Sequence, residues 1–316
     1  MLTVFLATRN GSGTLPGVLE SFTRLHVPPS GWKLVVVDNG STDQTCEIVA
    51  SFRASLPVTY VFEGRIGKNV ALNTGLKHLE GDLAVFTDDD AFPSPDWVIQ
   101  LQAAADAHQS YSMFGGVILP RWEETPPYWV RWVNAQTVFA LSDPRVMEGP
   151  TEPWRLFGPN MAIRAEVFKG GTRFDTSIGP RGSNYAMGSE TELVMRLGRQ
   201  GHKAWHVQGA VVEHFIRSHQ MDKSWVLGRA IRFGRGMFRM SVMAGAPAVP
   251  YWLGVPVHLL PKLFKKGAKT AKAWLSFNEQ AFFSARWEFN YLLGHVIEAR
   301  CLRRERCAHG NGEKES

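Results

Sequence analysis

Short apolar runs alternate with amphipathic segments along the first 110 residues. Runs rich in β-branched and other apolar residues predict buried strands, at 2–7, 33–37, 58–62 and 83–87. Segments with apolar residues at helical spacing predict the helices that follow them, at 15–25, 42–52, 68–79 and 96–108. This alternation predicts an α/β fold with a mostly parallel sheet flanked by helices, whose ligands bind beyond the carboxyl ends of the strands.

The pattern loses its regularity after residue 110. Residues 111–216 indicate a mixed region with long loops, and the Pro- and Trp-rich stretch 120–153 is typical of a surface loop that lines a site. Residues 217–309 predict two helices, at about 222–243 and 270–305.

Charge divides the chain at the same place. Residues 1–216 carry a net charge of −4, and residues 217–309 carry +11. We therefore expect one α/β domain over 1–216, made of a regular half (1–110) and a more irregular half (111–216). A basic, aromatic helical extension over 217–309 and a disordered tail at 310–316 would follow it.

The basic extension mixes Lys and Arg with aromatic residues. Such a mixture favours contact with an anionic membrane surface, and the alternative is a solvated basic face over an ordinary helical core. No recognised nucleic-acid-binding motif is present, so we expect no nucleic-acid partner.

The sparse cysteines and the lack of long apolar runs bear on localisation. Three cysteines provide no disulfide framework, which suits a reducing compartment. There is no uninterrupted apolar run of about 18 residues, and the chain starts directly with a strand-like run in place of a signal peptide. We expect a cytoplasmic protein, with peripheral contact to the inner face of the membrane as the refinement that the basic extension suggests.

Three consecutive carboxylates, Asp88, Asp89 and Asp90, follow the apolar strand at 83–87. Their mutual repulsion would raise at least one pKa, whereas a bound divalent cation would hold all three ionised. Carboxylate oxygens suit Mg²⁺ or Mn²⁺, which keep positions open for substrate phosphates. The triplet therefore predicts a metal–diphosphate site, and a solvated acidic turn is the alternative.

Asp38 ends another apolar strand, Val35-Val36-Val37-Asp38, before the turn Asn39-Gly40-Ser41-Thr42. At that position a carboxylate can accept hydrogen bonds from a base or a ribose, while Ser41 and Thr42 are best explained as turn and cap residues. A dinucleotide-binding fingerprint is rejected because the glycines Gly11, Gly13 and Gly17 are misspaced for it.

Four motifs in this order resemble glycosyltransferase family 2, the inverting GT-A enzymes. They are Thr8-Arg9-Asn10, VVVDNGSTD, GKNVALNTGL and FTDDDAFPSPDW. The resemblance implies a GT-A, Rossmann-like fold with a nucleotide-binding half (1–110) and an acceptor or catalytic half (111–216). It implies a nucleotide-sugar donor, with Thr8, Arg9 and Asn10 among the residues that contact it. It gives Asp38 the uracil contact, Asp89 the ribose contact with Asp88 close by, and Asp90 a metal ligand.

The resemblance extends these roles to other positions. The family's usual Arg before the position of Asn73 is Leu72 here, so Lys68 is the candidate for the missing charge on the diphosphate, and a solvated lysine is the alternative. Asn73 and Asn160 are carried over as donor or substrate contacts. His214 follows a β-branched run and would complete the metal shell, although a lone His is more often structural.

The catalytic base falls on Glu190 by the same resemblance. The family usually has Glu-Asp at this place, where this chain has Ser189-Glu190. A helix-terminal acid that stabilises the helix dipole is the alternative. Glu190 would remove a proton from an acceptor hydroxyl that displaces the nucleotide with inversion.

These expectations combine into an inverting, metal-dependent glycosyltransferase. It would use a UDP-sugar and a glycan or lipid-linked acceptor from polysaccharide or glycolipid assembly. A nucleotidyltransferase and a non-catalytic nucleotide-sugar-binding module are the alternatives. Release of UDP in place of pyrophosphate would distinguish a glycosyltransferase from a nucleotidyltransferase. A transfer assay would distinguish it from a non-catalytic binding module.

Overall fold

The chain folds into two compact units. The computed structural model describes residues 1–143, 145–182, 185–247 and 249–312, with side chains as far as Glu305. Unit 1 consists of three segments, Met1–Glu124, Ala135–Ser177 and Ser189–Arg217. Unit 2 consists of the remaining three, Thr125–Asn134, Ile178–Gly188 and Ser218–Ser316.

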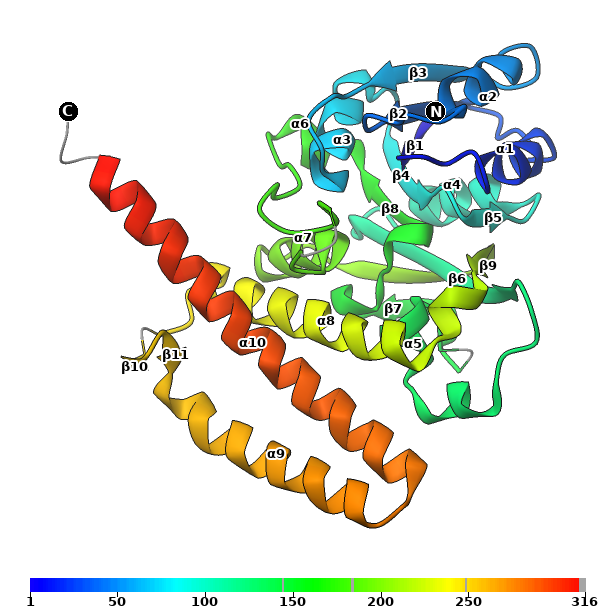
Figure 1. Cartoon of the computed structure of the whole chain (residues 1–316). Coiled ribbons are helices and arrows are strands. Elements are labelled where there is room, and N and C mark those ends of the chain that lie inside the picture. The colour runs from blue at the N-terminus through cyan, green and yellow to red at the C-terminus, as the bar shows by residue number, and fades with distance from the viewer. Residues whose placement is uncertain (144, 183–184, 248, 313–316) are drawn as a thin grey trace. The chain divides into compact units, whose positions relative to one another are not determined.

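Unit 1 is built on one large sheet (Figure 1). In the described part of the chain nine strands join it, in the order β3-β2-β1-β4-β8-β6-β9-β5, with β7 paired to β9. The strands are β1 (Leu2–Thr8), β2 (Trp32–Asp38), β3 (Val58–Phe62), β4 (Leu83–Asp88), β5 (Ala91–Pro93), β6 (Met113–Trp122), β7 (Gly149–Thr151), β8 (Met161–Arg164) and β9 (Ala204–Ile216).

The first four strands of the sequence form its parallel half. β3, β2, β1 and β4 pair in parallel register, β8 is antiparallel to both β4 and β6, and β9 returns parallel to β6. This arrangement confirms the predicted α/β class with a mostly parallel sheet flanked by helices.

Seven described α-helices belong to unit 1. They are α1 (Leu15–Thr23), α2 (Thr45–Ser51), α3 (Lys68–Gly75), α4 (Trp97–Ala107), α5 (Ala135–Phe139), α6 (Ala165–Lys169) and α7 (Ser189–Arg199). The helix predicted to begin at Thr42 begins at Thr45 instead. Two local hydrogen bonds explain the later start. The Thr42 amide donates to Asn10 Oδ1 at 2.9 Å, outside the helix, and Asp43 Oδ1 accepts the amide hydrogen of Thr45 at 3.1 Å. The predicted 68–79 helix ends at Gly75 and continues as the 3₁₀ turn η1 (Leu76–His78).

Several short elements occupy the stretch that we expected to be loop at 120–153. The end of β6, α5 and β7 lie in unit 1, and the 3₁₀ turn η2 (Tyr128–Trp132) lies in unit 2. Two further 3₁₀ turns follow in unit 1, η3 (Pro153–Arg155) and η4 (Gly158–Asn160).

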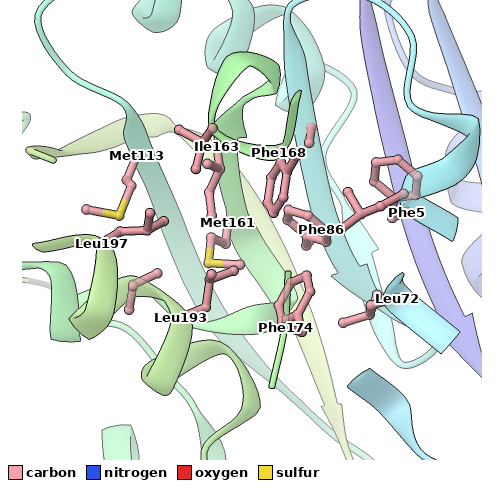
Figure 2. Packing of buried hydrophobic residues seen from close by; sticks show 14 of the residues in the cluster. Phe5, Leu72, Phe86, Met113, Met161, Ile163, Phe168, Phe174, Leu193 and Leu197 are labelled. Atoms are coloured by element: carbon pink, nitrogen blue, oxygen red, sulfur yellow. The ribbon is translucent and has the colours of Figure 1, made fainter. Parts of the chain in front are cut away.

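A phenylalanine-rich core fills one face of the sheet (Figure 2). Phe86 on β4 is its centre, with ring centroids 5.5 Å from Phe5 and 5.2 Å from Phe174. Leu193 and Leu197 on α7 pack against the same cluster. Because Phe86 is fully buried, truncation to Ala would cost about 3–5 kcal/mol.

Unit 2 is mainly helical. Its described elements are the 3₁₀ turn η5 (Ser218–Met221), α8 (Lys223–Met243), the two-stranded β10 (Tyr251–Trp252) and β11 (Val255–Pro256), η6 (Val257–Leu259), α9 (Leu260–Leu275) and α10 (Glu279–Gly312). The predicted 222–243 helix is confirmed as α8. The single helix predicted over 270–305 is wrong, because α9 and α10 meet at a turn where Phe277 has φ 54°. Asn278 then caps α10 by accepting the amide hydrogen of Ala281 at 2.8 Å.

Small residues allow α8 and α10 to cross closely. A Cβ on Gly234 would lie 1.9 Å from the carbonyl oxygen of Tyr291, and one on Gly294 would lie 2.2 Å from that of Ile231. Buried Glu298 pairs there with Arg235 at 2.7 Å and also with Arg239. α10 packs against α9 on another side.

The last segment of the chain is described as far as Gly312. α10 includes residues 310–312 of the predicted tail, and the rest of that tail lies outside the described residues. Within the described chain, none of the helices combines the length and apolar character needed to cross a bilayer.

Candidate active site

Three parallel strands bring the predicted nucleotide-binding residues to one edge of the sheet. Thr8 at the end of β1 lies opposite Asp38 at the end of β2, and Ala7 lies opposite Asp88 at the end of β4. This is the edge at which open α/β sheets bind ligands. All residues discussed below belong to unit 1.

Asp88 and Asp89 are partly buried carboxylates with different partners. Lys68 Nζ donates to Asp88 Oδ1 at 2.5 Å, and Thr8 Oγ1 donates to Asp89 Oδ2 at 2.5 Å. Loss of hydration raises the pKa of both carboxyls, that of Asp89 to about 7, and the negative charge of Asp90 adds to both shifts. A cation that binds this cluster would therefore stabilise the ionised carboxylates.

Asp90 lies against two side chains from the end of β9. Arg217 Nη1 donates to Asp90 Oδ2 at 3.0 Å, and His214 Nε2 lies 3.4 Å from Asp90 Oδ1. Antiparallel pairing of β5 with β9 places Ala91 opposite His214, which explains how these distant residues meet. Burial alone would raise the pKa of Asp90, but the contacts with His214 and Arg217 outweigh it and lower this pKa.

The ring of His214 is oriented by the backbone. Its Nδ1 lies 2.7 Å from the carbonyl oxygen of Phe139, which can only accept, so Nδ1 carries a proton. In the neutral ring Nε2 then has a lone pair facing a carboxylate oxygen, and either a proton or a metal ion must lie between them. Burial would lower the pKa of His214, but Asp90 outweighs this and raises it.

Asp90 and His214 are the residues that fit a divalent cation. A backbone carbonyl that holds the other ring nitrogen is the usual arrangement for a metal-binding histidine. Within the described residues, no three His, Cys, Asp or Glu side chains converge as a complete metal site. A cation here would therefore depend on ligand oxygens as well, as Mg²⁺ commonly does with substrate phosphates.

Asp38 is buried and held by neighbouring strands and turns. Tyr60 on β3 donates its hydroxyl to Asp38 Oδ2 at 2.8 Å, and the amide of Ser41 donates to Oδ1 at 2.8 Å. Burial, followed by this hydrogen bond to Asp38, raises the pKa of the Tyr60 hydroxyl. The carboxylate keeps lone pairs for further donors, since each of its oxygens can accept two.

The loop after β1 is joined to the loop after β2. Asn10 adopts φ 54°, its amide donates to Ser41 Oγ at 2.8 Å, and its side-chain oxygen accepts from Thr42. Asp43 Oδ2 accepts the amide hydrogen of Ser12 at 3.0 Å. Arg9 between these contacts is exposed. The predicted contacts of Thr8, Arg9 and Asn10 with a donor remain predictions.

Lys68 connects the acid triplet with Glu190. Its ammonium lies 2.5 Å from Asp88 Oδ1 and 2.6 Å from Glu190 Oε1. Burial alone would lower the pKa of Lys68, but attraction to the two carboxylates outweighs it and raises this pKa, so the ammonium stays charged. The alternative of a fully solvated lysine does not describe this side chain, because only 19% of it is exposed.

Gly158 makes room for the Glu190 side chain. Glu190 lies in the first turn of α7, and a Cβ on Gly158 would come within 2.6 Å of its Oε1 and 2.7 Å of its Cδ. Because glycine has no Cβ, Gly158 permits this close approach of Glu190 to the backbone.

The two predicted asparagines have their amides engaged within the protein. Asn73 Nδ2 donates to the carbonyl oxygen of Phe174 and its Oδ1 accepts the Phe174 amide, at 2.8 and 2.9 Å. Asn160 accepts from Trp97 Nε1 at 2.8 Å and donates to the carbonyl oxygens of Val117 and Ala210. These bonds fix the backbone beside the site, and the substrate contacts proposed for both remain predictions.

Sequence reasoning missed Tyr60 and Arg217. Tyr60 could have been found as a polar group on the strand that neighbours the one ending in Asp38. Arg217 follows His214 by three residues, directly after the end of β9, but no local pattern connects it with Asp90.

Solved structures share this fold. The mannosyltransferase PcManGT from Pyrobaculum calidifontis, solved with GDP-Man and Mn²⁺, matches with a TM-score of 0.62 at 20% identity, covering 94% of this chain and 86% of that one. Staphylococcus aureus TarS, solved with UDP, matches with a TM-score of 0.53 at 14% identity, covering 96% and 91%. The fold is that of the GT-A glycosyltransferases.

The family follows from the sequence match. Residues 3–173 match the family model described as Glycosyl transferase family 2, so the chain belongs to glycosyltransferase family 2. This confirms the resemblance drawn from the four motifs.

Curated relatives match part of the chain. The poly(ribitol-phosphate) beta-N-acetylglucosaminyltransferase TarS of Staphylococcus aureus is 29% identical over 153 residues, which cover 45% of this chain and 26% of that protein. The glucosyl-dolichyl phosphate glucuronosyltransferase of Haloferax volcanii is 23% identical over 158 residues, 48% of each chain. The match therefore spans less than half the length of either relative.

Proposed function

We propose that this protein is an inverting, metal-dependent glycosyltransferase that transfers a sugar from a nucleotide sugar to an acceptor hydroxyl. The observation that carries the proposal is the ion-paired series Asp88–Lys68–Glu190 at the ligand-binding edge of the sheet. Lys68 contacts both Asp88, which is among the acids expected to bind the donor, and Glu190, which is expected to act as base.

Donor binding is assigned to the strand ends. Asp38, oriented by Tyr60 and the Ser41 amide, is suited to accept from a nucleobase N–H, and Asp89 from a ribose hydroxyl. UDP is the nucleotide that we favour, because the resemblance assigns a uracil contact to Asp38 and a relative of the same fold was solved with UDP.

Asp90 and His214 would hold the divalent cation. Support comes from their converging Oδ1 and Nε2 atoms and from the Mn²⁺ present in the mannosyltransferase structure. A cation bound there would neutralise the charge that develops on the departing diphosphate. Arg217, which already donates to Asp90, adds positive charge beside the same carboxylate.

Glu190 is assigned the role of base. The acceptor oxygen forms a bond to the anomeric carbon as the bond from that carbon to the diphosphate oxygen breaks, and the electron pair leaves with the diphosphate. The proton of the acceptor hydroxyl passes to Glu190. Lys68, whose ammonium lies 2.6 Å from Glu190 Oε1, orients this carboxylate. A single displacement inverts the anomeric configuration.

The acceptor that we favour is a glycan or a lipid-linked intermediate. The relatives named above act on poly(ribitol phosphate) and on a glucosyl-dolichyl phosphate, so acceptors joined to phosphate occur among them. We also propose peripheral association with an anionic membrane, for which the charge of the C-terminal segment is the support.

Glu190→Gln tests the proposal directly. We expect transfer to fall on the order of 100-fold or more, because general base catalysis contributes about that much, while UDP binding stays within twofold. The assay follows release of UDP from a panel of UDP-sugars with Mn²⁺. Glu166→Gln, an exposed acid on α6, is the matched control. Undiminished transfer by Glu190→Gln would refute the base assignment, and pyrophosphate release would refute the reaction class.

A further inference from the structure

An apolar strip on α9 faces solvent. Phe264, Ala268, Ala271 and Leu275 recur at spacings of four, three and four residues, which places them on one side of a helix. All four are exposed, Phe264 at 82% and Leu275 at 65%. Such a continuous exposed apolar strip commonly marks a binding surface.

A different side of α9 is used for packing within unit 2. Leu263 joins the small core between α8, α9 and α10, and a Cβ on Gly267 would reach Phe289 of α10 at 3.7 Å. Lys266 and Lys269 both pair with Glu288 of α10. Figure 1 shows α9 running beside α10. The side of α9 that carries Leu263 and Gly267 packs within unit 2, while the residues of the apolar strip are exposed.

Lysines line the border of the strip. Lys262, Lys265, Lys269 and Lys272 recur at spacings of three, four and three residues, next to the apolar strip on the helix surface. Among the described residues no acidic partner of Lys262, Lys265 or Lys272 is found. The strip is therefore bordered by positive charge on one side.

The turn after α9 extends the apolar surface. Phe277 is 97% exposed and adopts φ 54°, a conformation that is unfavourable for a non-glycine residue. Because this aromatic ring is almost fully exposed, its apolar surface is not buried within the described chain. Burial of the ring would stabilise the protein only in a second apolar phase outside the chain.

We propose that α9 and the following turn form an interfacial membrane-binding element that lies in the plane of an anionic lipid surface. Phe264, Leu275 and Phe277 enter the boundary between headgroups and acyl chains, and Lys262, Lys265 and Lys272 contact lipid phosphates. A helix with a charged face, a separate apolar face and a low overall hydrophobicity has the properties of an interfacial helix.

The positive charge of the lysines beside the apolar strip favours a lipid surface over other binding partners. A second copy of this chain packed on the strip would bring two lysine rows together, which like-charge repulsion disfavours. A polyanionic polymer would engage the lysines but leave Phe264 and Leu275 in water. An anionic bilayer can bind both kinds of residue. Its headgroups attract the lysines, and its apolar interior can bury Phe264 and Leu275.

Vesicle flotation without donor or acceptor tests the element on the full-length protein. The probes are phosphatidylcholine vesicles alone and with about one third phosphatidylglycerol, which supplies anionic headgroups. One variant combines Phe264→Ser, Leu275→Ser and Phe277→Ser, and the other combines Lys262→Gln, Lys265→Gln and Lys272→Gln. The matched controls are Phe62→Ser, an exposed aromatic residue of unit 1, and the exposed unit 1 set Lys77→Gln, Lys169→Gln and Lys203→Gln.

The proposal predicts flotation of the wild type with anionic vesicles only, weakened by salt. The lysine variant should bind on the order of 100-fold more weakly at low salt, while its charge-matched control changes much less. The apolar variant should lose binding that remains at high salt. Equal binding by strip variants and controls, absence of wild-type binding, or a dimer that the apolar variant dissociates would each overturn the inference.

This inference deepens the membrane association proposed above and is independent of catalysis. Transfer to a soluble acceptor can persist when flotation fails, and flotation can persist in Glu190→Gln. The two proposals therefore fail separately. Thermal unfolding of each variant checks that the substitutions, which all lie on exposed side chains, leave the fold intact.

Discussion

Lys68 Nζ lies 2.6 Å from Glu190 Oε1. The two residues lie in the first turns of different helices, α3 and α7, far apart in the sequence. The same ammonium also contacts Asp88, so one cation compensates a carboxylate from the donor-binding edge and the proposed base. An ammonium placed between two carboxylates reduces the repulsion that they would otherwise exert on each other.

Lys68→Met should impair both stability and transfer. Without the ammonium, two partly buried carboxylates face each other unpaired, which we expect to cost about 2 kcal/mol in the free energy of unfolding. Transfer should fall roughly 100-fold as Glu190 loses its orientation. Urea unfolding and initial rates measure the two effects. Lys77→Met, at an exposed lysine, is the control, and equal behaviour of the two variants would contradict the role given to Lys68.

Gly158→Ala should displace the Glu190 carboxylate while the fold persists. The added Cβ would lie 2.6 Å from Oε1, so the glutamate side chain must move. A shift of about 1 Å at a catalytic group can cost 100-fold in rate, so kcat should fall by about that factor with little change in the KM for the donor. Steady-state kinetics measure both constants.

Gly228→Ala on α8 is the matched control for this variant. A Cβ there meets Arg232 at 3.5 Å, an ordinary contact. A Gly158→Ala enzyme with wild-type kcat would show that the observed position of Glu190 is not required for transfer.

His214→Ala should raise the Mn²⁺ concentration needed for half-maximal activity. Chelation of divalent ions should abolish wild-type transfer, and added Mn²⁺ should restore it. Loss of the imidazole should weaken the metal by at least about tenfold, the smallest effect usually seen around metal sites. Metal titration of the initial rate measures this. His202→Ala is the control because that ring contacts Ser112 at 3.0 Å instead, and an unchanged titration for His214→Ala would remove His214 from the metal site.

Glu63→Gln should make the free energy of unfolding less dependent on pH in the acidic range. Hydrogen bonds from Arg65, then from Thr74, lower the pKa of Glu63 from 4.5 to about 2. A lowered folded-state pKa means that the ionised carboxylate contributes stability above pH 4.5, and that this contribution is lost as the pH falls towards 2.

The expected contribution of Glu63 is about 1 kcal/mol, because its partner Arg65 is largely exposed and screened by solvent. Unfolding free energies at pH 6 and pH 3 should therefore differ less in Glu63→Gln than in the wild type. Glu47→Gln, at an exposed acid of α2, should behave as the wild type. An unchanged pH dependence in Glu63→Gln would contradict the assignment.

The parallel half of the sheet was predictable because its signals are local. A β-branched run such as Val35–Val37 buries on both faces of a sheet, and its predicted strand differs from β2 by one residue at each end. The α9–α10 turn was missed because Phe277 gives no sequence signal for a left-handed backbone. Asn278, a favoured helix cap, was the one local cue available.

The sequence by itself determined the α/β class, the family and the presence of acids at strand ends, because these depend on periodicity and on residues adjacent in the chain. Only the tertiary structure decided which groups meet. It placed Lys68 between Asp88 and Glu190, His214 and Arg217 on Asp90, and an exposed apolar strip on α9. These pairings depend on strand order, helix packing and solvent exposure, which no local pattern of residues specifies.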